Sequence, residues 1–341
     1  MHTSSAKPRV AITLGDPAGI GPEIVLETIL SEAIHEICDP FVIGHRDSLE
    51  IAARTRGIGD LTFHMISDPS EATFEQGVID LLQTDVENDA EIEFGKVQKA
   101  AALRAYSYLE KSIELGLAGK IDAVSTAPVN KAALKLAEVP YIGHTEIYQE
   151  LTESKYSLTM FNVHKLRVFF LSRHVSLREA CDLVTADRIV DYLTNIDGEL
   201  RSLGIDAPKI GVAALNPHVG EGGMFGREEI DEIIPGVQRA QEAGIRAQGP
   251  LSADAIFAFN LDGHNDAILS MYHDQGHIAC KTYDFENAVT VTLGLPFMRS
   301  SVDHGTAFDI AGKGIAQGAS MIESTRVAAV YSQMKLQHRA A

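Results

Sequence analysis

The sequence predicts an α/β fold with largely parallel strands, organised as two lobes. Short apolar runs alternate with longer stretches of helical periodicity along the 341 residues, which is the order expected of βαβ units. Apolar residues make up 45% of the chain, so there is enough apolar side chain for two hydrophobic cores of ordinary domain size.

The first predicted elements are a strand and a helix joined by a glycine-rich turn. The apolar run Val10–Leu14 has the length of a buried strand. Gly21–Leu30 is predicted to be a helix, with Pro22 in the first turn, where a missing N–H is tolerated. The intervening segment, GDPAGIGPE, opens that helix and suits close approach of an anion, although a tight turn is the commoner meaning of such a pattern.

A long amphipathic helix and a second strand come next. Apolar residues recur at every fourth position, at Val97, Ala101, Ala105, Leu109, Ile113 and Leu117. This spacing places them on one face of a helix. Gly119 is a plausible end of that helix, and Ile121–Ala127 has the composition of a strand.

The rest of the chain repeats the alternation. Further strands are expected at Leu166–Leu171, Ile210–Leu215, Ala267–Met271 and Val289–Leu293. A helix over Ser176–Leu183 begins with a capping box formed by Ser176 and Glu179. The helical stretch Arg227–Ala243 contains Pro235, which predicts a kink or a break.

The charge of the chain excludes several classes of partner. The sequence has 29 Lys and Arg against 47 Asp and Glu, a formal net charge of -18, which disfavours nucleic acid and anionic membranes. No apolar run approaches the ~18 residues of a membrane span, and the N-terminus lacks an apolar signal core, so a cytoplasmic protein is expected. Cys38, Cys181 and Cys280 are few, odd in number and dispersed, so no disulfide framework is predicted.

Three histidines follow the ends of three predicted strands. His174, His218 and His273 come after the strands that begin at residues 166, 210 and 267. Ligands of open α/β sheets collect outside the carboxyl ends of strands. Each histidine alone would be an ordinary loop residue, but three in one topological position predict a divalent metal site with positions open to substrate. Asp254 and Asp274 are candidates to orient such ligands or to accept protons.

Other polar segments suit an anionic ligand and a flat cofactor. The loop Gly143–Glu146 and the cations Lys281 and Arg299 are candidates for contact with phosphate or carboxylate. The segment His304–Ala316 is rich in small residues that would let the backbone pass close to a group such as adenine. Taken singly, each pattern also occurs in ordinary solvated loops.

Taken together, these motifs resemble the 4-hydroxythreonine-4-phosphate dehydrogenase family of vitamin B6 biosynthesis. The matching blocks are ITLGDPAGIGPEI, TAPVNK, GHTE, LNPHVGEGG, GPLSAD, MYHDQGH, TLGLPF with the following Arg299, and SVDHGTAFDIAGKG. They run in order from Ile12 to Gly314. The first and last blocks also resemble loops of isopropylmalate and isocitrate dehydrogenases, which implies a two-lobed α/β/α fold with the active site in the interdomain cleft at a dimer interface.

The resemblance assigns roles to individual residues. The metal ligands fall on His174, His218 and His273, and the metal would be Zn, Mg, Mn or Co. The substrate contacts fall on His144, Thr145, Lys281, Thr290 and Arg299. NAD, or NADP, would lie along the loop containing His304, Gly305, Thr306 and Asp309. The protein would be a homodimer with a shared active site. We expect one lobe at 1–140 plus 270–341 and the other at 141–269.

Two positions separate this chain from the commoner family pattern. The family usually has an Asn substrate ligand where this sequence has Thr290, and threonine keeps a hydroxyl but loses the amide donor. His277 stands where many biosynthetic members have an apolar residue. The change at Thr290 leaves the exact substrate open, and the stretch containing His277 looks closer to the family's catabolic branch, which oxidises D-threonate or D-erythronate 4-phosphate.

The function implied is NAD-dependent, metal-dependent oxidation of a secondary alcohol in a phosphorylated four-carbon hydroxy acid. With 4-hydroxy-L-threonine 4-phosphate the product is a 3-oxo acid that then loses carbon dioxide. The alternative substrate is D-threonate or D-erythronate 4-phosphate. Lys281, or Asp274 with a metal-bound water, would take the hydroxyl proton. Two rival functions are a metal-dependent hydrolase and a non-catalytic protein that binds a phosphorylated metabolite.

Overall fold

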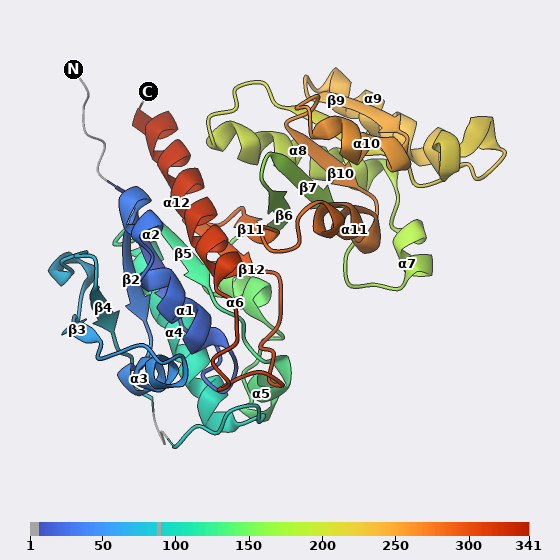
Figure 1. Cartoon of the computed structure of the whole chain (residues 1–341). Coiled ribbons are helices and arrows are strands. Elements are labelled where there is room, and N and C mark those ends of the chain that lie inside the picture. The colour runs from blue at the N-terminus through green and yellow to red at the C-terminus, as the bar shows by residue number, and fades with distance from the viewer. Residues whose placement is uncertain (1–6, 87–89, 341) are drawn as a thin grey trace. The chain divides into compact units, whose positions relative to one another are not determined.

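The computed structural model describes residues 7–86 and 90–340 and confirms an α/β fold (Figure 1). The chain divides into two units, each built from separate segments. Unit 1 comprises Met1–Ser157 and Val289–Gln333, and unit 2 comprises Leu158–Ala288 and Met334–Ala341. The first two boundaries therefore lie about twenty residues beyond the predicted ones, at 157/158 and 288/289 rather than 140/141 and 269/270.

Packing of two helices explains the shift of these boundaries. Helix α6 (His144–Leu151) buries Ile147 and Tyr148 in the core of unit 1. Helix α11 (His273–Tyr283) packs against strands of unit 2 and contributes Cys280 to its core. Each helix thus belongs with the unit that buries its apolar face, which the sequence pattern alone does not reveal.

Unit 1 is a seven-stranded portion of sheet in the order β3-β4-β2-β1-β5-β12-β11. Its strands are β1 (Arg9–Thr13), β2 (Asp39–Ile43), β3 (Thr62–Met65), β4 (Val78–Leu82), β5 (Ala123–Thr126), β11 (Val289–Leu293) and β12 (Met298–Val302). All neighbouring pairs are parallel except β11 with β12. The helices of this unit are α1 (Gly21–Ile29), α2 (Glu32–Ile37), α3 (Arg46–Thr55), α4 (Lys99–Leu117), α5 (Lys131–Leu136), α6 and most of α12 (Ala319–Ala340).

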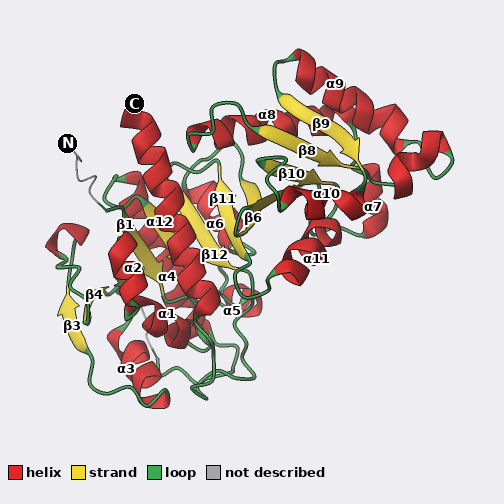
Figure 2. Ribbon diagram, turned by 45° about the horizontal axis from the view of Figure 1, so that its top comes forward, coloured by secondary structure: helices red, strands yellow, loops and turns green. Residues whose placement is uncertain are grey.

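Unit 2 has five strands in the order β6-β7-β10-β8-β9. They are β6 (Leu158–Val163), β7 (Leu166–Phe170), β8 (Lys209–Ala213), β9 (Arg246–Leu251) and β10 (Ala267–Ser270). The hairpin β6–β7 is antiparallel and the other pairs are parallel. Its helices are α7 (Leu177–Asp182), α8 (Ala186–Ser202), α9 (Ile234–Glu242), α10 (Ala253–Asn260) and α11. Figure 2 shows helices against the strands of each unit.

The predicted elements are confirmed to within about two residues at most ends. On α4 the predicted apolar stripe is buried at Ala105, Leu109 and Ile113, while Leu117 at the end is exposed. The Ser176 hydroxyl accepts the backbone N–H of Glu179 at 3.2 Å, as the capping box predicts. The predicted kink or break at Pro235 does not occur: the π-helical turn η3 (Glu229–Ile233) runs directly into α9, and Pro235 lies in the first turn of α9, where a missing N–H is tolerated.

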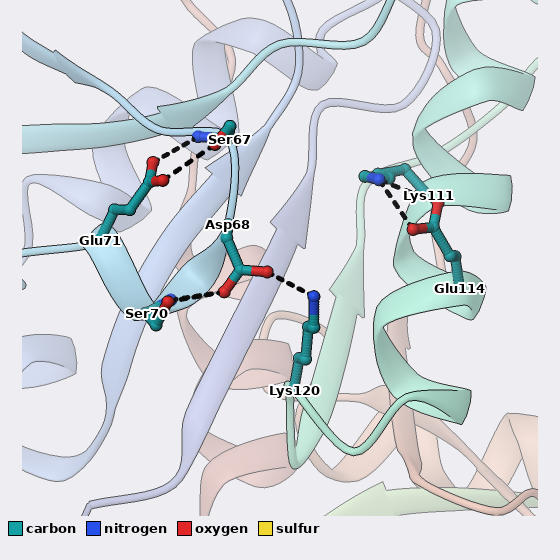
Figure 3. Close-up of polar contacts among 7 residues, drawn as sticks. All are labelled: Ser67, Asp68, Ser70, Glu71, Lys111, Glu114 and Lys120. Carbon is teal, nitrogen blue, oxygen red and sulfur yellow. Dashed lines mark hydrogen bonds and ion pairs between the residues drawn. The ribbon is translucent and has the colours of Figure 1, made fainter.

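A polar cluster of unit 1 fastens the connection after β3 (Figure 3). The carboxylate of Asp68 accepts the backbone N–H of Ser70 at 3.0 Å and also binds the ammonium of Lys120, which follows α4. The hydrogen bond from Lys120 holds the pKa of Asp68 below its usual range. The cluster is exposed, so we expect it to contribute little to the free energy of unfolding. It links the segment after β3 to the segment after α4 and so fixes their local conformation.

No helix among the described residues has both the length and the apolar composition needed to cross a bilayer.

Candidate active site

The three predicted metal ligands lie at one edge of the sheet in unit 2. Strand β10 lies between β7 and β8 and is parallel to both, so their carboxyl ends meet at the same edge. His174 follows β7, His218 lies in the turn η2 (Pro217–Gly223) after β8, and His273 begins α11 after β10. The rings of His174 and His273 have centroids 5.8 Å apart. The predicted topological placement is confirmed.

The ring of His273 is fixed on both sides. Its Nδ1 atom is 2.6 Å from Oδ1 of Asp274, which leaves Nε2 available as a ligand. The ring stacks on that of His277 with centroids 3.8 Å apart, and His277 stacks in turn on Phe170 at 4.3 Å. His277 also approaches the carbonyl oxygen of His273 at 2.9 Å through Nδ1. His277 thus holds the ring of His273, a candidate metal ligand, in place. In the sequence, His277 stood out only by comparison with the family.

His218 is held by a strained backbone. Its φ is 52° and that of Val219 is 59°, the left-handed region, which costs about 1–2 kcal/mol for each residue with a side chain. Strain of this kind persists only where surrounding structure enforces it. His218 lines a cavity of about 410 Å³ together with Asp254, Tyr272 and Asp274.

A neighbouring cavity contains the other two histidines. His174 and His273 line a cavity of about 310 Å³ whose wall also includes Tyr272 and Asp274. These two residues therefore belong to both cavities. Asp254, the other predicted acidic partner, is exposed and accepts the hydroxyl of Ser252 at 2.6 Å.

The donor chemistry suits a divalent cation. Across residues 7–86 and 90–340, no three His, Cys, Asp or Glu side chains are close enough to coordinate one ion together. Two of the imidazoles have a spacing that ligands of one ion can adopt. The carboxylate of Asp274 on His273 is the kind of partner that orients a metal-binding imidazole. The described residues of one chain thus bring two of the three predicted ligands together.

Unit 1 buries a guanidinium for which the described residues provide no carboxylate. Arg299 is 2% exposed and lies inside β12. Its Nη atoms donate to the hydroxyls of Thr292 at 2.7 Å and Thr126 at 3.0 Å, while Nε has no described partner. Burial lowers the pKa of Arg299 to about 10. The guanidinium also lies 5.0 Å from the ring centroid of Tyr148, a cation–π contact. Because none of these described partners carries a negative charge, the arrangement is suited to an arriving anion.

His144 adds a second polar group to the same part of unit 1. Its Nε2 atom is buried and has no described partner. Burial, and next the positive charge of Arg299, hold the pKa of His144 well below its usual range, so the ring is neutral at pH 7. The following residue, Thr145, is half-buried in the first turn of α6. His144 and Arg299, both predicted as substrate contacts, are therefore close enough for the charge of Arg299 to affect the pKa of His144.

The surroundings of the other two predicted substrate contacts, Lys281 and Thr290, give less indication of a ligand. Lys281 lies on α11 in unit 2, with its Nζ 5.6 Å from the ring centroid of Phe285. Thr290 is half-buried in β11 of unit 1. The sequence did not single out Thr126 and Thr292, the hydroxyl partners of Arg299, although they are the first residues of the blocks TAPVNK and TLGLPF.

The two glycine-rich loops, considered separately in the sequence, pack against each other in unit 1. The N–H of Ile20 donates to the carbonyl of Thr306 at 3.0 Å. A Cβ on Gly19 would lie 2.7 Å from that carbonyl oxygen, so only glycine allows this approach. Thr306 is buried, whereas Gly305 and Asp309 are exposed and His304 is half-buried. The role of these four residues in binding NAD stays a prediction.

Asp16 is a buried carboxyl that the sequence did not single out. It is fully buried, its Oδ1 accepts the N–H of Ala18 at 2.9 Å, and its Oδ2 has no described partner. Burial raises the pKa of Asp16 to about 6. The ionised carboxylate is therefore disfavoured in the fold, as is common for groups kept for function rather than stability.

We expect Asp16→Asn to stabilise the chain at neutral pH. The pKa of Asp16 rises from 3.8 to about 6 on folding, so its contribution to stability is present below about pH 4 and is lost as pH rises through about 6. The variant should gain up to about 3 kcal/mol over the native chain at pH 7.5. Urea unfolding at pH 7.5 and near pH 4 checks this, since the gain should vanish at the lower pH. An equal gain at both would contradict it.

Comparisons with known proteins agree with this geometry. A family model described as "Pyridoxal phosphate biosynthetic protein PdxA" matches residues 36–328. A relative from Halalkalibacterium halodurans named "Putative D-threonate 4-phosphate dehydrogenase" is 50% identical over 326 residues, covering 96% of this chain and 97% of the relative.

Two crystal structures show the same fold. A 4-hydroxythreonine-4-phosphate dehydrogenase from Burkholderia phymatum is 40% identical, with a TM-score of 0.85 over 96% of this chain and 99% of the other. The enzyme of that name from Klebsiella pneumoniae is 36% identical, with a TM-score of 0.89 over 96% of this chain and 100% of the other.

Proposed function

The chain belongs to the PdxA family, and from this premise we propose that it is a dehydrogenase that uses NAD to oxidise a phosphorylated four-carbon hydroxy acid. The observation that carries the proposal is Arg299, a buried cation whose described partners are hydroxyls. With the neutral His144 beside it, this arginine suits a dianionic phosphate. The names of the relatives favour D-threonate 4-phosphate as the substrate.

The second candidate substrate is 4-hydroxy-L-threonine 4-phosphate. The names of the two similar crystal structures support it. Its amino group would require an acceptor or a metal position that the hydroxyl of D-threonate does not. Thr290, in place of the family's usual asparagine, keeps a hydroxyl but lacks the amide donor, and the relatives at 50% and 48% identity carry the D-threonate name, so we rank this substrate second.

The residues of this chain would divide the chemistry as follows. His174, His218 and His273 would hold a divalent cation, which when bound would polarise the substrate hydroxyl and stabilise negative charge on its oxygen. Arg299, His144 and Thr145 would bind the phosphate and orient the reacting carbon. Lys281 or Asp274 would accept the hydroxyl proton, and the 3-oxo acid formed by loss of hydride would then lose carbon dioxide.

The proposal also covers the cellular location and the oligomeric state of the enzyme. We place it in the cytoplasm as a homodimer. Met224 and Phe225, 74% and 49% exposed beside the His218 loop, are apolar side chains that a second copy would cover. Size-exclusion chromatography with light scattering should therefore give about twice the 36.9 kDa chain mass.

An NADH assay with matched four-carbon phosphates tests the function. We expect absorbance at 340 nm to rise with D-threonate or D-erythronate 4-phosphate, and about tenfold or more slowly with 4-hydroxy-L-threonine 4-phosphate, because each missing polar contact costs ~1.4 kcal/mol or more. Activity should disappear with EDTA and return with zinc, manganese, cobalt or magnesium.

The same assay separates the rivals. Release of inorganic phosphate without NADH would identify a hydrolase. Tight substrate binding by calorimetry without NADH, with metal present, would identify a binding protein. Faster turnover of 4-hydroxy-L-threonine 4-phosphate would reverse the order of the two substrates.

A further inference from the structure

The loop that carries His218 has an unusual backbone. Five consecutive residues, from His218 to Gly222, have φ between 43° and 75°. Three of them are not glycine, and Val219 is β-branched, the class of residue least compatible with this region. A run of this kind does not hold itself in place, so contacts from outside the loop must fix it.

One buried carboxylate makes those contacts. Glu229 lies in the π-helical turn η3 and is 1% exposed. Its Oε1 accepts the backbone N–H groups of Leu215 at 2.8 Å and Asn216 at 2.7 Å. Its Oε2 accepts the side-chain amide of Asn216 at 2.9 Å, an amide that also donates to Oε2 of Glu228 at 2.6 Å. The three bonds fix the two residues from which the left-handed turn starts.

The turn also closes over the same carboxylate. A Cβ on Gly220 would lie 2.8 Å from Oε2 of Glu229, so the backbone passes directly against it. No Lys, Arg or His among the described side chains forms an ion pair with Glu229. Its charge is therefore balanced by donors of the loop itself, and burial makes those bonds strong.

We infer that Glu229 is a positioning residue that fixes the turn carrying His218, a predicted metal ligand. This inference rests on the proposed metal site and adds a residue to it. Glu229 contacts neither the imidazole nor a substrate. It acts through Leu215 and Asn216, which lead into the turn, and so sets the position from which His218 is presented.

The test is the affinity of the full chain for zinc or cobalt(II), measured by calorimetry, in Glu229→Gln. Glutamine can still accept the two backbone N–H groups through its oxygen. Its NH₂ group would then face the amide of Asn216, donor against donor. We expect metal affinity to fall by roughly 10- to 100-fold, the usual effect of losing a residue that orients a ligand.

Asp231→Asn is the matched control. It removes the same charge from the same π-helical turn, but Asp231 is 49% exposed and its carboxylate pairs with Arg227 at 2.7 Å, whereas Glu229 bonds Leu215 and Asn216. Its metal affinity should equal that of the native chain. Activity gives a second measure, because excess metal should restore kcat in Glu229→Gln while the KM for the phosphorylated substrate stays unchanged.

The possible results separate the inference from the proposed function. Metal affinity of folded Glu229→Gln within twofold of the native chain would overturn the inference alone. Absence of metal binding by the native chain would overturn the proposed site, and the inference with it. If circular dichroism shows that Glu229→Gln does not fold, Asn216→Ala replaces it. That variant keeps both carboxylate–backbone bonds and removes the side-chain amide. A fall in its metal affinity would support the inference, and a metal affinity within twofold of the native chain would overturn it.

Discussion

Arg299→Met is expected to abolish most activity and to raise thermal stability. The native guanidinium is buried with hydroxyl partners, so its removal relieves a desolvation cost that replacement by an apolar side chain of similar volume can avoid. Loss of a buried partner for the phosphate should cost about 2–5 kcal/mol of binding. We therefore expect kcat/KM for the phosphorylated substrate to fall by roughly 10²- to 10³-fold, and calorimetry to give a Tm no lower than that of the native chain.

Arg104→Met is the matched control for this result. Arg104 is also buried in unit 1, but it pairs with the carboxylate of Asp47 at 3.0 Å. Its replacement should lower Tm, because the bonds from the guanidinium to both oxygens of Asp47 are lost, and should leave kcat/KM unchanged. If Arg299→Met lowers Tm as much as Arg104→Met does, Arg299 is a structural residue and the argument for an anion site fails.

The same arginine shows where inference from the sequence ends. The sequence placed Arg299 after an apolar segment, and the structure places it inside β12, whose segment MRSSV has no apolar alternation. The strand exists because its polar side chains find distant partners. Ser300 donates to the carbonyl of Ser324 at 2.8 Å, and Arg299 donates to Thr126. Such partners come from segments far away in the chain, and periodicity carries no signal of them.

The histidines were predictable for the opposite reason. Each follows an apolar run that is recognisable as a strand, and parallel strands bring their carboxyl ends to one edge. Their positions directly after three predicted strands of a parallel sheet therefore predicted that His174, His218 and His273 share that edge. Asp16 and Glu229 were not predictable, because acidic residues in loops and helices are by default exposed. Only the tertiary fold shows that both are buried, with oxygens facing backbone N–H groups.

His218→Ala is expected to remove metal-dependent turnover while leaving the fold intact. An imidazole ligand is lost from a set of three, so kcat in the presence of metal should fall at least about 10³-fold. The backbone conformation gives a second expectation. Because φ at this position is 52°, His218→Gly should be more stable than His218→Ala by about 1 kcal/mol in urea unfolding, although it should be equally inactive.

His164→Ala is the control that separates these two effects. His164 has the same φ of 52°, lies in the turn between β6 and β7, and bonds Asp284 at 2.8 Å through Nε2. Its replacement by alanine or glycine should show the same dependence of stability on backbone strain, because the strain arises from φ and not from the imidazole. Turnover and its dependence on metal should be those of the native chain. If His218→Ala keeps full turnover, or if His164→Ala loses it equally, then activity depends on the backbone of such turns and not on a ligand at position 218.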